Sequence, residues 1–337
     1  MRIKWYVSDG HACGHVRGEV VARAVNKLYS PHIIDIKTAI SLSDYYAADV
    51  MVFQRQHDPG VLDKLRLAKQ MGIFTVYEID DDFFNTPEEF GGPWKFYSNP
   101  DVRKLINLFL NEADAVTVST HPLKKAIAAL TLRPIYVVEN ALDVDFWERE
   151  KPYNRQPVVG WMASGSHMID APLVVAPLIR LMEEREDLKL LTIGLMGPEE
   201  MPGLEKFGER AMIMKWQMQE VLPDRVRHID IGLAPLRAHL FNDSKSHIKA
   251  LQYWANKTPV VCSPSPAYND LVIDGENGIV AETEDDWYKA ISRLLDDREE
   301  RDRLGANGYK LLVEKYDIRN FANNWLNLFS NMLSTKC

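Results

Sequence analysis

Two lysines four positions apart follow a small polar loop in the second half of the chain. From residue 241 the sequence reads Phe-Asn-Asp-Ser-Lys-Ser-His-Ile-Lys, so Lys245 and Lys249 share one face if a helix begins by Lys245. Two cations at the beginning of a helix oppose its dipole, and that cost is offset if an anion binds there. The segment therefore predicts an anion site, with Asn242 and Ser244 in the adjoining loop. The alternative is a surface helix with exposed lysines.

Three consecutive carboxylates, Asp80, Asp81 and Asp82, follow a strand-like run at residues 74–79. The carboxyl ends of strands are where doubly wound sheets bind ligands, and crowded like charges are costly to stability. Three interpretations stay open. The carboxylates could bind a divalent cation, they could bind the hydroxyl groups of a substrate or act as a base, or they could form a solvated loop in which one Asp caps a helix.

Small residues fill two turns that each follow a strand-like run. The first turn contains Gly10, Gly14 and Arg17, and the second contains Ser164, Gly165 and His167. Small residues let a ligand approach the backbone, and the helix that follows offers free N–H groups to a phosphate. An arginine suits phosphate because its donors form a planar fork. Neither turn has the spacing of the dinucleotide fingerprint, and either could be a tight turn without a ligand.

Short β-branched runs alternate with longer amphipathic stretches along the whole chain. Strands are expected at residues 3–8, 50–53, 74–79, 115–119 and 135–138, and then at 158–162, 189–193, 229–234 and 260–262. Helices are expected at residues 61–71, 102–112, 122–130, 171–184, 246–255, 285–295, 298–314 and 318–333. This alternation predicts an α/β protein with two doubly wound units, joined by the polar, proline-flanked stretch 148–157. The last helix carries an apolar stripe that needs a partner.

Composition narrows the classes of function. The 337 residues are 46% hydrophobic, which is enough for two cores, and the net charge is −8. A nucleic-acid binder usually has a basic surface, so this charge weakens that interpretation. Three widely spaced cysteines indicate neither a disulfide framework nor a metal knuckle. Because neither a membrane-spanning run nor an apolar leader is recognisable, the expected location is the cytoplasm.

Several segments together, by their order and spacing, resemble a known family. These are residues 113–119, 137–143, 158–167, 230–236, 241–263 and 277–280. They are similar to GT-B glycosyltransferases of the retaining, sucrose-synthase-like type (glycosyltransferase family 4, group 1). The resemblance implies two Rossmann-like domains facing a cleft, formed by residues 1–150 with 317–337 and by residues 151–316, with the last helix crossing back onto the first domain. It also implies metal-independent transfer, with retention, from a nucleotide-diphosphate sugar, most often a UDP-sugar.

The resemblance also implies roles for individual residues. Lys249 matches the lysine that meets the donor phosphates and would stabilise the charge of the leaving diphosphate. The other matched residues lie around the donor: Asn242, Ser244 and Lys245 in one loop, Ser164, Gly165 and His167 in the second turn, and Gly10, Gly14 and Arg17 in the first. Gln252 stands where the family usually has a ribose-binding Glu, and Asp80 and Asp81 stand where many relatives have a His. No residue is expected to bind a metal.

The acceptor stays open at this stage. A glycan, a lipid-linked sugar, a small molecule or a hydroxymethylated base in DNA would each fit a GT-B transferase, and no partner protein is indicated. The aromatic segment 83–97 is the expected acceptor-facing lid. A sugar-nucleotide 2-epimerase and a non-catalytic nucleotide-binding protein are the competing classes, and the paired lysines favour a transferase over both.

Overall fold

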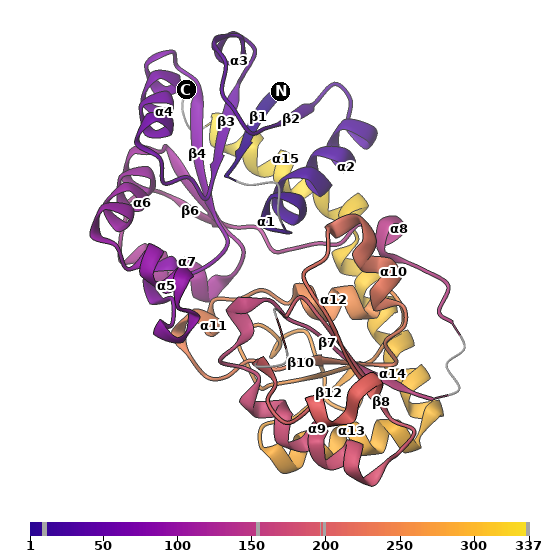
Figure 1. Cartoon of the computed structure of the whole chain (residues 1–337). Coiled ribbons are helices and arrows are strands. Elements are labelled where there is room, and N and C mark those ends of the chain that lie inside the picture. Colours follow the sequence, from indigo (N-terminus) through magenta and orange to yellow (C-terminus); the bar gives the residue numbers. More distant parts are fainter. Residues whose placement is uncertain (9–11, 153–155, 196, 198–199, 335–337) are drawn as a thin grey trace. The chain divides into compact units, whose positions relative to one another are not determined.

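The chain divides into two compact units (Figure 1). This computed structural model describes residues 1–8, 12–152, 156–195, 197 and 200–334. The first unit comprises Met1–Asp143, Asp243–Ser246 and Asp317–Cys337, and the second comprises Val144–Asn242 and His247–Tyr316. The chain therefore passes to the second unit earlier than the expected position after residue 150. The short segment Asp243–Ser246, which we expected in the second domain, lies with the first unit.

The first unit is built on a six-stranded parallel sheet in the order β2-β1-β3-β4-β5-β6. Its strands are β1 (Arg2–Val7), β2 (Ile33–Lys37), β3 (Val50–Gln54), β4 (Phe74–Ile79), β5 (Ala115–Val118) and β6 (Ile135–Val137). Its helices are α1 (Ala12–Gly14), α2 (Val20–Leu28), α3 (Leu42–Tyr46), α4 (Pro59–Gln70), α5 (Gly92–Tyr97), α6 (Pro100–Glu112), α7 (His121–Ala128) and α15 (Ile318–Ser334). Strands such as β3 and β4 are buried along their whole length because helices cover both faces.

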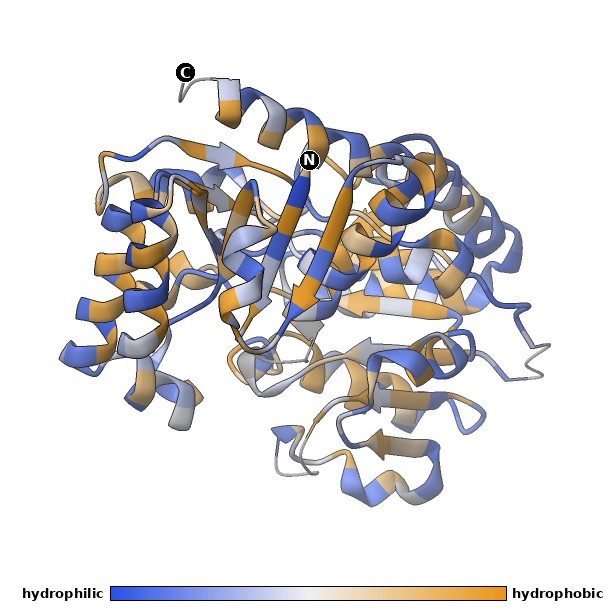
Figure 2. Ribbon diagram, turned by 90° about the horizontal axis from the view of Figure 1, so that it is seen from above, coloured by the Kyte–Doolittle hydropathy of each residue, from blue (hydrophilic) through white to orange (hydrophobic). Residues whose placement is uncertain are grey.

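The C-terminal helix α15 completes the core of the first unit. Trp325 meets Trp5 of β1 edge to face, with 5.0 Å between ring centroids, and Phe329 packs beside both rings. These residues share one apolar cluster with α2 and the middle of the sheet. The partner expected for the apolar stripe is therefore the first unit itself. Hydrophobic residues run along the strands, as the orange arrows of Figure 2 show.

The second unit holds another six-stranded parallel sheet, in the order β12-β11-β10-β7-β8-β9. Its strands are β7 (Val158–Met162), β8 (Lys189–Ile193), β9 (Ala211–Met214), β10 (Ile231–Ala234), β11 (Val260–Cys262) and β12 (Gly278–Val280). Its helices include α8 (Val144–Trp147), α9 (Pro172–Glu184), α10 (Leu222–Val226), α11 (Leu240–Asp243), α12 (Ile248–Trp254), α13 (Glu284–Asp296) and α14 (Arg298–Leu311). This strand order is that of the Rossmann fold.

Each sheet has one point where the strand order reverses direction. In the first sheet it lies between β1 and β3, and in the second it lies between β7 and β10. Ligands of doubly wound sheets bind at the carboxyl ends of the strands on either side of such a point. The loops that follow these four strands are therefore where a site is expected.

No helix among the described residues is both long enough and apolar enough to pass through a bilayer.

Candidate functional site

One buried tyrosine, Tyr253, holds helix α12 against β7 and β10, the two strands between which the order of the second sheet reverses. The Tyr253 hydroxyl accepts a hydrogen bond from the Met162 N–H at 2.9 Å, and it lies 3.0 Å from the Leu233 carbonyl oxygen, to which it donates. Its ring fills the space left by Gly232, where an added Cβ would lie 2.5 Å from the ring. The last residues of β7 and β10 thus hold the helix that carries Lys249 and Gln252.

A buried polar network lies at the carboxyl ends of β7 and β10. The Asp170 side chain is fully buried and contacts His167 Nδ1 through Oδ2 at 2.8 Å. Its other oxygen accepts hydrogen bonds from Asn242 Nδ2 at 2.7 Å and from the Arg237 N–H at 2.8 Å. The Asn242 amide also donates to the Arg237 carbonyl, and its own Oδ1 is buried without a hydrogen-bond partner among the described residues. His167 and Asn242, which the sequence placed in separate motifs, are therefore joined through Asp170.

The turn after β7 leaves its backbone accessible. Ser164 is exposed, and a Cβ on Gly165 would have no other atom within 4 Å. Gly194, at the end of the neighbouring strand β8, is the opposite case. Its φ is +101°, and an added Cβ would lie 2.0 Å from the Ala163 carbonyl oxygen. The fold itself requires glycine at 194, whereas the space beside Gly165 remains open.

The lysine loop differs from the expectation in one respect. Helix α12 begins at Ile248, so Lys245 precedes the helix and does not share a helical face with Lys249. Within the first unit, the Thr120 hydroxyl donates to the Ser244 carbonyl at 2.9 Å, and the Asn140 amide donates to Ser246 Oγ at 2.7 Å. These two hydrogen bonds explain why the segment Asp243–Ser246 lies with the first unit. Lys249 is half-buried and Gln252 is buried on α12.

Arg17 is a core residue rather than a surface ligand. Only 2% of it is exposed, and its Nε donates to Glu78 Oε1 at 2.7 Å, where Glu78 is fully buried. Its Nη1 donates to the Val138 carbonyl and to Asn140 Oδ1, and its guanidinium lies 5.0 Å from the Trp325 ring. This corrects the expectation that Arg17 faces a donor phosphate, since its donors are engaged inside the first unit.

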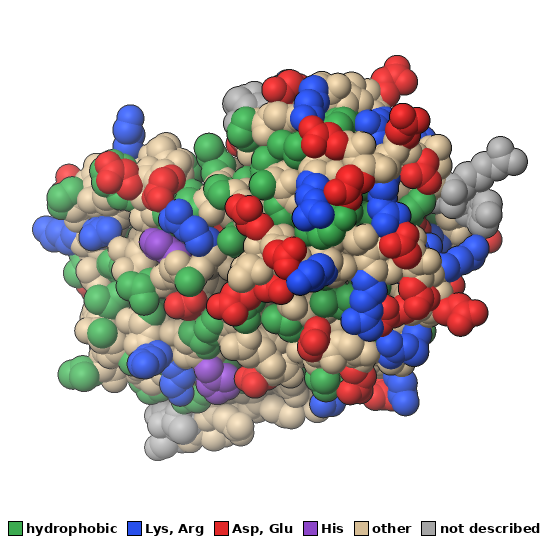
Figure 3. Space-filling view, turned by 90° about the horizontal axis from the view of Figure 1, so that it is seen from below, with side chains coloured by type: hydrophobic (Ala, Val, Ile, Leu, Met, Phe, Trp, Pro, Cys, Tyr) green, Lys and Arg blue, Asp and Glu red, His purple; other side chains and the backbone are tan. Residues whose placement is uncertain are grey.

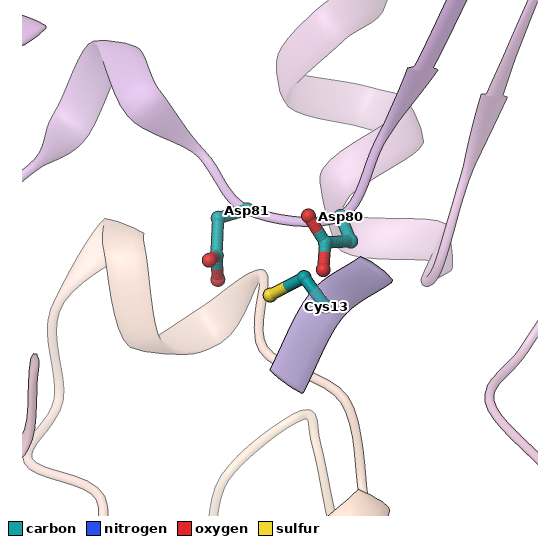
Figure 4. A group of neighbouring side chains, drawn as sticks. All are labelled: Cys13, Asp80 and Asp81. Carbon is teal, nitrogen blue, oxygen red and sulfur yellow. The ribbon is translucent and has the colours of Figure 1, made fainter. Parts of the chain in front are cut away.

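A different arginine lies among the carboxylates. Arg55 follows β3, and its Nη1 lies 3.2 Å from Asp80 Oδ1, 3.3 Å from Asp81 Oδ2 and 2.6 Å from Cys13 Sγ. Figure 4 shows the side chains of Cys13, Asp80 and Asp81 converging from α1 and from the loop after β4. Asp82 is separate from this group, because it caps the turn Phe83–Asn85 through the Phe84 N–H. The three neighbouring aspartates therefore have two different surroundings.

Burial shifts the pKa of several side chains in the first unit. Burial raises the pKa of the Glu78 carboxyl, although Arg17 opposes the rise, and burial also raises the pKa of the Asp82 carboxyl. The Cys13 thiol has a raised pKa because it is buried, so it is a neutral thiol at neutral pH. Burial alone would lower the pKa of Arg55, but the charges of Asp80 and Asp81 outweigh burial and raise that pKa. Arg55 is thus a permanent cation.

Two of the predicted glycines remain to be placed. Gly10 lies outside the described residues, and Gly14 is buried at the end of α1. The residues that sequence reasoning missed are Asp170, Tyr253 and Arg55. Asp170 stands three positions after His167 in the sequence. Tyr253 and Arg55 gave no signal, because their partners are distant in the sequence.

Comparison with known proteins finds a family model that matches part of the chain. Residues 156–297, which carry the β7–β10 site, match the family model described as Glycosyl transferases group 1. No curated protein matches the chain in sequence.

Solved structures extend the likeness to the whole chain. HepE from Anabaena, in complex with UDP and glucose, has a TM-score of 0.68 at 12% identity, and the match covers 98% of this chain and 100% of that one. Sucrose-phosphate synthase from Thermosynechococcus elongatus has a TM-score of 0.67 at 12% identity, covering 99% and 100%. TarM has a TM-score of 0.63 at 16% identity, covering 83% of this chain and 54% of TarM. The fold is therefore GT-B, built from two Rossmann-like units, and residues 156–297 of the second unit are similar to group 1 glycosyltransferases.

Proposed function

We propose that this protein is a glycosyltransferase that takes a sugar from a nucleotide-diphosphate sugar held by the second unit. The observation that carries the proposal is the His167–Asp170–Asn242 network at the carboxyl ends of β7 and β10. It lies where Rossmann-like sheets bind nucleotides, and within the segment that matches group 1 glycosyltransferases. A fully buried carboxylate with three partners is costly to build, which favours a role in holding ligand groups in place.

The chemistry follows from the residues around that network. Lys249 on α12 would contact the donor diphosphate and stabilise the negative charge that develops as the sugar leaves. Ser164 and Gly165 would let the phosphates approach the backbone, and Asn242, whose amide is held by Asp170, would position the segment that follows β10. Gln252 would bind the ribose as a neutral side chain. Gly14, Ser244 and Lys245 stay predictions as further donor contacts.

A UDP-sugar is the donor that the comparisons favour. HepE was solved with UDP and with UDP-glucose, and a mutant TarM of S. aureus was solved with UDP. Transfer would proceed with retention and without a metal ion, as the resemblance to the sucrose-synthase-like group implies. Lys249 would then supply the positive charge that a metal supplies in other transferases.

The acceptor in this proposal is a hydroxyl compound bound by the first unit, with Asp80 and Asp81 accepting hydrogen bonds from its hydroxyl groups. Modified DNA is the less favoured acceptor in this proposal. The net charge is −8, and the face in Figure 3 shows acidic and basic side chains interspersed rather than a basic stripe. A duplex would require such a stripe to neutralise its phosphates.

Thermal-shift titration with UDP, GDP, ADP, CMP and dTDP tests the donor site. A ligand that binds only the folded protein stabilises it by mass action, and the melting temperature rises as a result. At a ligand concentration of a hundred times Kd, the free energy of unfolding increases by about 2.7 kcal/mol. We expect one nucleoside diphosphate to stabilise the wild-type protein and Lys249→Ala to lose that stabilisation. Lys310→Ala, which changes an exposed lysine on α14, is the matched control. If no nucleotide shifts the wild-type transition, the donor site is refuted.

Release of free UDP from UDP-glucose, followed over time, separates an enzyme from a nucleotide-binding protein. We expect slow release by water alone and faster release with the correct hydroxyl acceptor. Binding without any release, over a broad panel of acceptors, would favour the non-catalytic alternative.

A further inference from the structure

Arg55 stands where a cation would be expected among the ligand atoms of three neighbouring residues. Cys13 Sγ and one carboxylate oxygen each of Asp80 and Asp81 all lie within 4.8 Å of one another, which is the arrangement of a small metal site. The Arg55 Nη1 atom lies between 2.6 and 3.3 Å from all three side chains. Metal–ligand bonds to such atoms are about 2.0 to 2.6 Å long, so an ion bound to these atoms would collide with the guanidinium.

We propose that Arg55 is a positioning residue that takes the place of a metal ion in the Cys13–Asp80–Asp81 cluster and orients both carboxylates toward the acceptor. This inference rests on the proposed function only in naming the acceptor as the group that the carboxylates meet. The geometric part, a fixed guanidinium in place of an ion, stands on the contacts alone.

The position of Arg55 is fixed from several sides. Its φ is +53°, which is a costly conformation for a residue with a side chain, and its N–H donates to the Glu78 carbonyl of β4 at 2.9 Å. Its guanidinium lies 4.7 Å from the Phe83 ring, and that ring stacks on Tyr97 with 4.2 Å between centroids. The residue before it, Gln54, donates to the Cys13 carbonyl at 2.9 Å. The backbone thus fixes where the Arg55 side chain begins, and the Phe83 ring, Cys13 and the two carboxylates hold its guanidinium.

Charge explains why a guanidinium suits this place. Two neighbouring carboxylates with little exposure repel each other, and a cation between them offsets that repulsion. An arginine stays charged at every physiological pH and makes directional hydrogen bonds, so it orients each carboxylate as well as neutralising it. Arg55 engages one oxygen of each carboxylate, and 10% of the Asp80 side chain and 23% of the Asp81 side chain remain exposed. Hydroxyl groups of an acceptor can bind there.

Cobalt binding tests the inference without any need for activity. Co²⁺ bound to a cysteine sulfur gives a strong charge-transfer absorption in the near ultraviolet. We expect no such absorption when cobalt chloride is added to the wild-type protein. Arg55→Met, which keeps an unbranched apolar stem but removes the cation, should gain it, and Arg55→Lys, which keeps a cation, should not.

Two controls make the cobalt result specific. The double variant Arg55→Met with Cys13→Ser should lose the absorption, because Cys13 supplies the sulfur. Melting temperatures show whether each variant is folded, and Arg55→Lys remains informative if Arg55→Met is not. Strong thiolate absorption in the wild-type or Arg55→Lys protein, or its absence from folded Arg55→Met, would overturn the inference.

Titration with UDP separates this inference from the proposed function. Arg55 lies in the first unit, so Arg55→Met should bind UDP as the wild-type protein does, within about twofold. If Arg55→Met loses UDP binding while the wild-type protein binds it, Arg55 is a donor residue and the inference is wrong. If the wild-type protein does not bind UDP, the proposed function fails but the cobalt result stands.

Discussion

Replacing Arg17 by methionine distinguishes a core ion pair from a phosphate ligand. The variant removes the cation that pairs with Glu78, a carboxylate with no exposed surface, and leaves the apolar part of the side chain in place. Breaking a buried ion pair by removing one partner costs about 3–5 kcal/mol, because the remaining charge is uncompensated. For a unit of this size, each kcal/mol lowers the melting temperature by about 2–4 °C. We therefore expect the first unit to melt about 6 to 20 °C lower.

The pH dependence of this variant follows from the buried carboxyl. Burial already raises the Glu78 pKa in the native protein, and loss of Arg17 removes the interaction that opposes the rise. The folded variant then holds a proton that the unfolded chain releases near pH 4.3, the ordinary value for Glu. A carboxyl with a raised folded-state pKa favours folding below that pH, and this contribution is lost as pH rises through the folded-state value. The stability deficit of Arg17→Met should therefore shrink as the pH is lowered from 8 toward 5.

The assay is thermal unfolding of the wild-type protein, Arg17→Met, Glu78→Gln and the double variant at several pH values. The double variant should be more stable than the sum of the single effects predicts, because it leaves no unpaired charge. If Arg17→Met melts like the wild-type protein but loses UDP binding, the guanidinium serves a phosphate and our assignment of Arg17 is wrong.

Three further predictions concern the second unit and the metal. Gly165→Val should melt like the wild-type protein yet weaken UDP binding at least tenfold. The control Gly194→Val should fail to fold, because its Cβ would meet the Ala163 carbonyl. Equal UDP affinity in Gly165→Val would remove that turn from the donor site. Tyr253→Phe should lose about 1–3 kcal/mol in denaturant unfolding, because the buried Met162 N–H loses its acceptor, and an unchanged midpoint would contradict this role. Incubation with EDTA should leave the rate of sugar transfer unchanged, and a loss of rate that Mg²⁺ or Mn²⁺ restores would refute metal independence.

The fold class was predictable because its signals are local. Buried strands of parallel sheets are continuous apolar runs, and β7, β8 and β11 begin and end where those runs do. Strand β2 was missed because its sequence, Ile-Ile-Asp-Ile-Lys, interrupts the apolar run. Strand β9 was not assigned, since it lies at a half-exposed sheet edge, and β12, which begins with a glycine, was not assigned either.

The site was predictable only where a motif carries its own chemistry. Ser164, Gly165, His167 and Asn242 stand in loops that follow strands, and the structure places those loops at one sheet edge. Arg17, which the sequence singled out, lies buried against Glu78, whereas Arg55, which it did not, lies beside Asp80 and Asp81. Arg17 follows a glycine-containing turn, which is typical of a phosphate site, but its partner Glu78 lies on a distant strand. A pairing between residues so far apart in sequence leaves no local pattern to find.

Amide hydrogen exchange with and without UDP tests the central claim most directly, because it locates the nucleotide on the chain. Ordered backbone in contact with a ligand exchanges more slowly. The account predicts that UDP protects peptides covering residues 163–170 and 237–252, at the carboxyl ends of β7 and β10, and leaves peptides at the opposite sheet edge, such as residues 224–230, unchanged. Protection confined to other parts of the chain, or no protection at saturating UDP, would contradict the claim that the second unit holds the donor there.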